Sequence, residues 1–430
     1  MPSINDSSGE GPPHPLSRFV VVRHHEISAL MASFAMFFAL LAAYYIVRPV
    51  RDEMGVEVGK DEIHHLFTMV FFVMLAAVPA FGLVATRFPR RLVLPSLYAF
   101  FALNLIGFWV VFRFWGIAPA AAGTFFVWAS VFNLFVVSLF WSLMSELWST
   151  QEAKRLYGFI GAGGTAGALA GPLLAQGLLR IFQPVDLLPV SALLLAVALG
   201  MSLVLRAIRP GHGEHETEPA GGGILDGAVK VMTDPFFARI AGYVLLANIV
   251  GTFFYMEQSR LVGAAIADSA ERVKFFASRD LAVSIITLTV ELVGTAYVLN
   301  KLGVAVALLA LPIVAAVSVL ALSSHPILWV VAAAMVAERV CAFSLSSPAI
   351  KLMYTLATPA EKYKVQSFVD TVVYRGGDAV SGWAFSLLGA GAGFASAVVP
   401  AVALPLVGLW LWNARALASV YDTRSRESHV

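Results

Sequence analysis

Apolar runs of about twenty residues recur along nearly the whole chain and are separated by short polar segments. A bilayer core takes roughly 20 helical residues to cross, and a helix satisfies its own backbone hydrogen bonds there. The pattern therefore predicts an all-α polytopic membrane protein with twelve transmembrane helices. We expect these helices at 28–47, 66–86, 92–112, 121–146, 157–181, 186–205, 238–256, 281–299, 303–322, 327–347, 367–389 and 392–413.

The longest hydrophilic segment inside the chain, 206–237, lies near the middle of the sequence and divides the predicted helices into two groups of six. We expect an N-terminal six-helix bundle over 28–205 and a C-terminal six-helix bundle over 238–413. The segment between them is predicted to be a cytoplasmic loop. The polar ends of the chain, 1–27 and 414–430, are predicted to be cytoplasmic tails, the first of them disordered.

Composition and charge support this picture and indicate an orientation. Only 13% of the residues are charged, whereas soluble domains have about a quarter, and the mean hydropathy is +0.80. The expected inner segments hold about twice as many Lys and Arg residues as the outer ones, which places both termini in the cytoplasm and the protein in the cell inner membrane. The outer segments still hold several basic residues that need another explanation: Arg48, Arg51, Lys60, Arg113, Arg180, Arg260, Arg272, Lys274 and Arg279.

The small net charge of +2 does not point to a nucleic-acid partner. The expected partners are the lipid bilayer and a small anionic solute, with the protein as a monomer. The single cysteine, Cys341, excludes an intramolecular disulfide. The adjacent histidine pairs His24–His25 and His64–His65 lack carboxylates at metal-ligand spacing, so we expect neither a metal site nor a cofactor.

Two short loops and one glycine series point to a transporter. The loops at 82–91 and 300–303 stand at the same place in the two predicted halves, and both resemble the basic turn of major facilitator transporters. Gly163, Gly167 and Gly171 are spaced four residues apart, so that they share a helix face and allow close helix packing. A duplicated bundle is the usual architecture of secondary transporters.

Ionisable residues inside the predicted spans are the main functional candidates, because such groups are expensive in lipid and usually face a cavity or a partner. Structural pairing remains an alternative for some of them: Arg48 with Asp52, four residues apart, and Arg375 with Asp378, three apart. We expect Glu291 to be the most poorly solvated acid. The candidates are Arg48, Arg51, Asp52, Glu146, Glu152, Glu257, Arg260, Glu291, Glu338, Arg339, Asp370, Arg375 and Asp378.

Three stretches resemble the Tlc-type nucleotide (ATP/ADP) carrier family and, more closely, its relatives in free-living bacteria. Val47 to Asp52 is similar to the Leu-Arg-Pro-x-Lys-Asp that ends the family's first helix. Glu152 to Gly161 is similar to its Glu-Ala-Lys-Arg-x-Tyr-x-x-x-Gly segment, and Glu361 to Val373 to the lysine-rich approach to helix eleven. Tyr255-Met256-Glu257 is a weaker fourth match, to the acidic end of helix seven.

The resemblance implies a twelve-helix facilitator-like fold that moves a phosphorylated anion. It implies that Arg51 stands where a lysine faces phosphate, that Glu152 and Glu257 are functional acids, and that Lys362 and Lys364 act near helix eleven. The chain also departs from the family: Gln366 replaces a further lysine, so a less charged organic anion stays open as the substrate.

The function predicted from these observations is secondary active transport of a small anionic solute, nucleotide-like by the resemblance, through alternating access. Gly161 to Thr165 lacks the lysine of a phosphate-binding loop, so hydrolysis is not expected to drive transport. A proton-coupled facilitator for another organic anion or a drug-like solute is an alternative, and so is an integral-membrane enzyme acting on lipid-linked phosphate. We expect a transporter rather than an enzyme, with no catalytic residues.

These considerations assign each candidate a role. The residues expected to bind substrate are Arg48, Arg51, Glu257, Arg375, Asp378, Lys362 and Lys364. The residues expected to act in coupling or gating are Asp52, Glu146, Glu152, Glu291, Glu338, Arg339 and Asp370.

Overall fold

A computed structural model describes residues 23, 26–59, 62–87, 90–209, 224–391 and 403–427. Over this part of the chain the structure is helical and has no strand, as the apolar runs predict. The first half contributes six long helices: α1 Ile27–Val58, α2 Ile63–Arg87, α3 Arg90–Trp115, α4 Pro119–Leu147, α5 Thr150–Leu178 and α6 Leu187–Ile208.

The second half also forms six rods, three of which contain π-helical turns. The short helix α7 Ile224–Thr233 precedes them. The rods are α8 Pro235–Ala265; α9 Ser269–Val290, which continues through Leu302; α10 Val304–Ser324; α11 Leu328–Cys341, which continues into α12 Ser347–Met353; α13 Pro359–Phe368, which continues into α14 Tyr374–Gly391; and α16 Leu404–Glu427.

Nine of the helices in the described ranges are long and apolar enough to cross a membrane. The helix α9 is not among them, because Lys274, Arg279 and Asp280 interrupt its apolar run. It nevertheless occupies a place beside the spanning helices, so its charges are inside the fold. The all-α, two-bundle architecture predicted from the sequence is confirmed.

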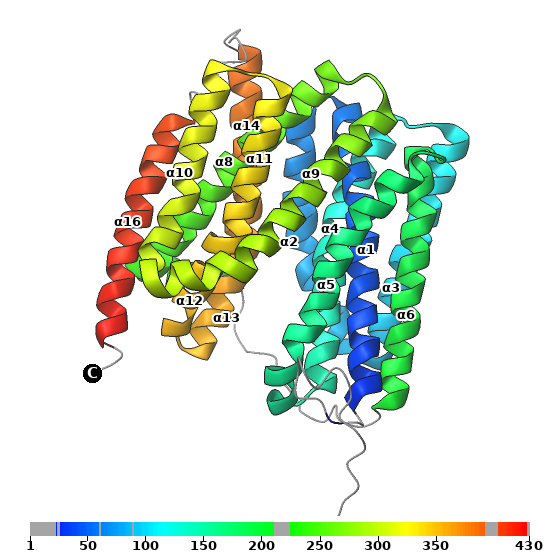
Figure 1. The fold of residues 1–430 in the computed structure, drawn as a ribbon, viewed down its shortest axis with the longest axis horizontal. Coiled ribbons are helices and arrows are strands. Elements are labelled where there is room, and N and C mark those ends of the chain that lie inside the picture. The colour runs from blue at the N-terminus through cyan, green and yellow to red at the C-terminus, as the bar shows by residue number, and fades with distance from the viewer. Residues whose placement is uncertain are drawn as a thin grey trace, which may run out of the picture.

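The two bundles lie side by side in Figure 1, with α1, α3 and α6 on the right and α10, α16 and α8 on the left. Within the first bundle, α1 packs against α4, α5 and α6. The bundles meet through α2 against α14, and through α9, which packs on α1 and α5. The start of α1 and the end of α16 lie at the same end of the molecule, the lower end in Figure 1; we call it the terminal end and the opposite one the distal end.

The glycine series on α5 lies against α1. A Cβ placed on Gly167 would overlap with the backbone carbonyl of Phe38, and one on Gly171 would lie 2.7 Å from the Cβ of Tyr45. On Gly163 it would collide with Phe34. Because only glycine lets the two backbones approach so closely, this face of α5 fixes the position of α1 and of the charged residues that α1 carries.

Equivalent helices of the two halves begin with the same kind of N-terminal cap. Ser149 and Glu152 form a capping box at the start of α5, the fifth helix of its half. Thr358 and Glu361 form a second one at the start of α13, which begins the fifth rod of the other half. A capping box satisfies free backbone N–H groups at a helix start, so both acids have a structural role at the terminal end.

Element boundaries differ from the prediction at several places. The first helix runs on to Val58, so that Arg48, Arg51 and Asp52 lie inside it and not at its end. The second rod of the C-terminal half begins at Ser269, twelve residues before the expected 281. At the other end of the chain α16 continues to Glu427, beyond 413. Most of the N-terminal tail and residues 210–223 of the central loop fall outside the described residues, as do the side chains of the 82–91 loop.

Candidate functional site

A network of buried ion pairs joins the two halves at the distal end. Arg279 of α9 donates a hydrogen bond of 2.7 Å to Asp52 of α1, and Arg48 of α1 lies 3.4 Å from a carboxylate oxygen of Asp280. Glu53, the next residue of α1 after Asp52, accepts two hydrogen bonds, of 2.7 and 2.8 Å, from Arg272. Burying a charge is costly unless it is paired and hydrogen-bonded, and these acids and cations pair with one another across the interface.

Tyr255 of α8 adds a neutral contact to this network, since its hydroxyl donates to Asp52 over 3.1 Å. Asp52 is therefore held from both α8 and α9, the first two rods of the C-terminal half. In the described part of the chain, every ion pair that crosses between the halves belongs to this distal network.

A polar cavity of about 600 Å³ lies between the halves, on the terminal side of the network. Residues of α1, α2 and α4 line one wall, and residues of α8, α11, α12 and α14 line the other. The structure brings half of the fourteen predicted binding and coupling residues to this cavity: Arg48, Arg51, Glu338, Arg339, Asp370, Arg375 and Asp378.

Two other hollows are larger but apolar. One, of about 1110 Å³, lies on α2, α3 and α4 among side chains such as Phe72 and Phe100 that are more than half exposed. Exposed apolar side chains on a spanning helix face lipid, so this hollow is the kind of surface that acyl chains fill. The polar cavity between the halves is the better candidate for a solute site.

Two arginines in the cavity come from opposite halves and form no ion pair with a described residue. Arg51 projects from α1 and lies 4.3 Å from the centre of the Phe126 ring; Arg339 projects from α11. The Nε atom of each is buried, and neither side chain forms a hydrogen bond or ion pair with another described residue. A guanidinium has five N–H donors in a planar fork that matches carboxylate and phosphate groups, so both can receive an anion.

Asp378 of α14, in contrast, is fully engaged. It accepts hydrogen bonds of 2.7 Å from Thr252 and 3.0 Å from Asn248, both on α8, and a longer one of 3.3 Å from Arg375. The pairing of Arg375 with Asp378, one of the alternatives from the sequence, is therefore present. The other alternative was wrong: Arg48 and Asp52 both turn to α9 and do not pair with each other.

Several predicted site residues lie outside the cavity. Glu257 is bonded to Arg260, three residues on, by hydrogen bonds of 2.9 and 2.6 Å. Lys364 pairs with Asp226 of α7 over 3.0 Å, and Lys362 is exposed. Glu291 is also exposed. The structure thus gives these four residues no contact with the cavity.

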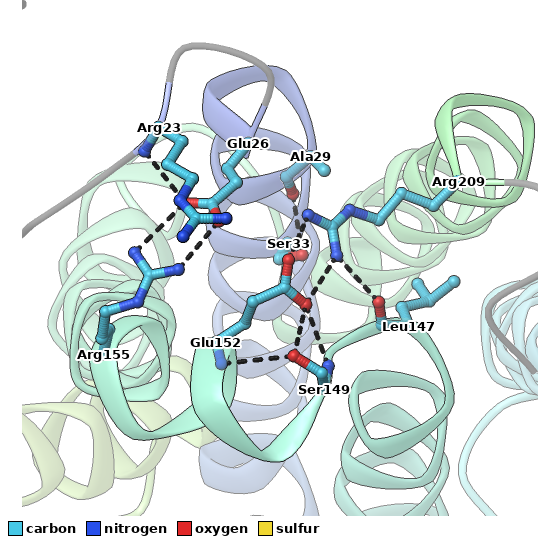
Figure 2. Close-up of polar contacts among 9 residues, drawn as sticks. All are labelled: Arg23, Glu26, Ala29, Ser33, Leu147, Ser149, Glu152, Arg155 and Arg209. Atoms are coloured by element: carbon cyan, nitrogen blue, oxygen red, sulfur yellow. Dashed lines mark hydrogen bonds and ion pairs between the residues drawn. The ribbon is translucent and has the colours of Figure 1, made fainter. Parts of the chain in front are cut away.

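The acids Glu146 and Glu152 lie at the terminal end of the first bundle. Glu146 pairs with Arg206 over 3.3 Å. Glu152 binds both guanidinium nitrogens of Arg209, at 3.1 and 3.0 Å, and Figure 2 shows how Arg209 also reaches the carbonyl of Leu147 at the end of α4. These contacts tie α4, α5 and the end of α6 together within one half.

Burial alone would raise the pKa of Glu152, but the hydrogen bonds from Arg209 and Ser149 outweigh it and lower this pKa to about 2. The equivalent acid of the other half behaves alike: hydrogen bonds from Lys230 and Thr358 lower the pKa of Glu361 to about 2. Both acids are ionised at neutral pH, and both bind a cation of their own half.

The sequence prediction missed the α9 side of the distal network, Arg272, Arg279 and Asp280, together with Glu53 and Tyr255. The sequence placed Arg272 and Arg279 in an outer loop; the structure places them in a helix, where they face α1. A usable signal was present: these charges recur at helical spacing in a segment that precedes an apolar run.

No protein-family model and no curated protein sequence matches the chain. Its structure, however, is similar to those of solved membrane transporters. A bacterial homologue of the iron transporter ferroportin, in an inward-facing state, shows 15% identity over 92% of this chain and 98% of its own, with a TM-score of 0.64. The nucleoside transporter NupG shows 14% identity over 93% and 99%, with a TM-score of 0.63.

A third structure, the POT family transporter PepTSo, shows 13% identity over 93% of this chain and 98% of its own, with a TM-score of 0.64. The chain has the fold of the major facilitator transporters. At such low identities the likeness shows the fold alone, and the sequence comparisons give no support to the ATP/ADP carrier family in particular.

Proposed function

We propose that the protein is a secondary active transporter that carries a small organic anion through the cavity between its two halves. One observation carries this proposal: Arg51 and Arg339, from opposite halves, line the same cavity and form no hydrogen bond or ion pair with a described residue. An unpaired charge away from bulk water is costly. A carboxylate or phosphate of the solute supplies the missing partner, with short charge-assisted hydrogen bonds.

The size and lining of the cavity suit an organic body attached to the anionic group. A volume of about 600 Å³ lies within the usual range for small-molecule sites, roughly 300–1,000 Å³. Tyr44, Tyr45, Tyr255 and Tyr374 offer aromatic rings to the cavity. Together with the resemblance of Val47 to Asp52 to the nucleotide carriers, this favours a phosphorylated, nucleotide-like solute within the class of organic anions.

The distribution of ion pairs supports alternating access. The halves are joined by buried pairs at the distal end, whereas the pairs at the terminal end, such as Glu152–Arg209 and Lys230–Glu361, each stay within one half. Rocking of the two bundles would break the distal pairs and open the cavity at the distal end. With both termini in the cytoplasm, as the charge bias predicts, the state described here opens inward.

Transport by purified protein in liposomes tests this function. The panel holds radiolabelled ATP, ADP, a sugar phosphate and a dicarboxylate, measured as uptake and as exchange against the same solute inside. We expect uptake of at least one anion, and its loss in Arg51→Ala and Arg339→Ala. Arg113→Gln, an exposed cation bonded only to Gln183, is the matched control.

Two results would overturn the proposal. The first is uptake of a neutral or cationic solute in a wider panel, with none of any anion. The second is turnover of a lipid-linked phosphate by the purified protein without transport, which would favour the enzyme alternative.

A further inference from the structure

Glu338 is a buried acid that faces the transport cavity without a bonding partner among the described residues. It projects from α11, is 9% exposed and lines the same cavity as Arg51 and Arg339. Within the described ranges, its carboxylate forms no hydrogen bond and no ion pair. Arg339 is adjacent in sequence, but neighbouring residues on a helix point about 100° apart, and the two form no ion pair.

The groups packed around Glu338 do not neutralise it. The helix α8 approaches it at Gly251, where a Cβ would lie 3.4 Å from a Glu338 oxygen. The titratable groups that sense its charge are the Tyr243 hydroxyl of α8, the Tyr374 hydroxyl of α14 and the Cys341 thiol of its own helix. None of these is a cation at physiological pH.

The remaining neighbours of α11 give no cation either. The helix α10 contains no ionisable residue. On α9, Arg279 and Asp280 are bound to α1 and to each other. On α14, Arg375 is bonded to Asp378. Two cations of the rod formed by α11 and α12 line the cavity: Lys351 forms no ion pair with Glu338, and Arg339 is the group that we assign to the transported anion.

We propose that Glu338 is the proton-binding site that couples movement of the anion to a proton gradient. This inference rests on the proposed function, because it assigns the coupling ion to the same cavity. A proton removes the uncompensated buried charge without any further ligand. It binds one carboxylate oxygen on entry from the open side and leaves the same oxygen after the bundles have rocked.

A metal cation fits this position less well, because it needs several oxygen ligands. The nearest hydroxyls are already used: Tyr243 donates to the carbonyl of Leu308 over 2.9 Å and bonds to Ser346 over 2.8 Å. In the described residues there is no group of three or more acidic, histidine or cysteine side chains that could hold a metal. A single carboxylate is sufficient for a proton.

Coupling follows from the shared cavity. An ionised Glu338 repels an anion held by Arg51 and Arg339, and protonation removes the repulsion, so each ligand strengthens binding of the other. Linkage makes the effect reciprocal. The anion therefore binds more tightly as the pH falls, and a proton gradient directed toward the anion's destination drives its accumulation.

The first experiment needs no transported solute. A hydrophobic carbodiimide reacts with the protonated form of a buried carboxyl and leaves a stable N-acylurea, which peptide mass spectrometry assigns to a residue. We treat the full chain in phosphatidylethanolamine–phosphatidylglycerol liposomes with dicyclohexylcarbodiimide over a pH series. We expect an adduct at Glu338 that increases as the pH falls, and none at this position in Glu338→Gln.

The inference is overturned if no adduct forms at Glu338 at any pH, or if the amount of adduct does not change with pH. This holds even if anion exchange is intact. Glu338→Gln has nearly the same shape, and its elution in size-exclusion chromatography checks that it folds. Because the labelling series is also measured on the unaltered chain, its result does not depend on the variant.

The second experiment uses ATP as the probe. If ATP is not exchanged, an anion of the panel that is exchanged takes its place. We expect an inward-directed proton gradient to increase ATP uptake, and Glu338→Gln to reduce that stimulation by about tenfold, within the usual range for coupled ligands, while exchange at equal pH continues. Glu62→Gln, an exposed acid bonded only to His65, is the control.

Equal stimulation in Glu338→Gln, or stimulation by a sodium gradient instead, rejects the proton site. No transport of any anion, with pH-dependent labelling retained, rejects the proposed function but not proton binding.

Discussion

Arg279 of α9 and Asp52 of α1 form a buried ion pair of 2.7 Å that joins the two halves of the molecule at the distal end. Both side chains are at most 2% exposed. Arg279 also donates to Gln258 over 2.6 Å, so it connects α1, α8 and α9 through one guanidinium. Asp280, the next residue, approaches Arg48. In the proposed alternating-access cycle, this pair lies at the end of the cavity that would have to open.

Arg279→Gln is expected to destabilise this closed end. Removal of one partner leaves Asp52 as an uncompensated buried charge, which typically costs about 3–5 kcal/mol. We measure it with a cysteine reporter at Ser259, a buried residue near Gln258, in a Cys341→Ser background. Labelling by a membrane-impermeant maleimide should be faster in Arg279→Gln than in the parent.

Lys274→Gln is the matched control, because Lys274 pairs only with the exposed Glu271 on its own helix. It should leave the reporter's labelling rate close to that of the parent. Equal rates in Arg279→Gln and the parent would contradict a closing role for the distal network.

Arg51 and Arg339 are expected to determine anion affinity. Hydrogen bonds to charged groups contribute about 1.5–3 kcal/mol each, so Arg51→Ala or Arg339→Ala should weaken anion binding by about 10- to 150-fold. Arg51→Lys retains the positive charge but loses the planar set of N–H donors. Its anion affinity should therefore lie between those of the parent and Arg51→Ala. The measurement is the concentration dependence of anion exchange. Unchanged affinity in both alanine variants would exclude these arginines from the solute site.

Much of the fold follows from the sequence, because hydropathy acts on each segment separately. Runs such as 303–322 predict a spanning helix whatever they pack against, and α10 occupies Val304–Ser324. Charges inside such runs, such as Glu338 and Arg339, must face something other than lipid. That argument alone identifies several cavity residues.

What the sequence could not provide is which helices face each other. Arg272 and Arg279 resemble loop residues because their segment is polar; only the contact of α9 with α1 gives them partners. Glu257 was expected in the site on the basis of a resemblance, although Arg260 stood three residues away at pairing distance. A cation on the same helix can pair with a buried acid without any solute.

Glu152 is expected to stabilise the protein in a pH-dependent way. Its pKa in the folded state is lowered to about 2, so the stabilisation is fully present above the unfolded-state pKa, which is about 4.3. It is lost as the pH falls from there toward about 2. Glu152→Gln should destabilise by about 1–3 kcal/mol at neutral pH, through the lost cap and the unpaired Arg209.

Thermal unfolding in detergent measures this effect. The difference in unfolding temperature between Glu152→Gln and the parent should shrink as the pH falls from about 4.3 toward about 2. The reason is that the carboxylate of the parent then also loses its charge. Glu271→Gln is the control: its exposed acid pairs only with the nearby Lys274. A difference that stays constant with pH would show that the charge of Glu152 does not contribute to stability.

Gly167 provides the sharpest test of the packing that positions α1. Alanine usually stabilises a helix relative to glycine by about 0.5–1 kcal/mol, and at Gly158, on the same helix, a Cβ meets nothing within 4 Å. Gly158→Ala should therefore be neutral or stabilising. At Gly167 the new methyl group would overlap with the carbonyl of Phe38, and overpacking typically costs about 1–3 kcal/mol.

Gly167→Ala should therefore lower the unfolding temperature in detergent. It should also weaken anion exchange, because a displaced α1 moves Arg51 and Asp52 together. If instead it unfolds at the same temperature as Gly158→Ala, the close contact of α5 with α1 does not exist in the membrane protein. The position of the cavity wall formed by α1 would then have to be drawn differently.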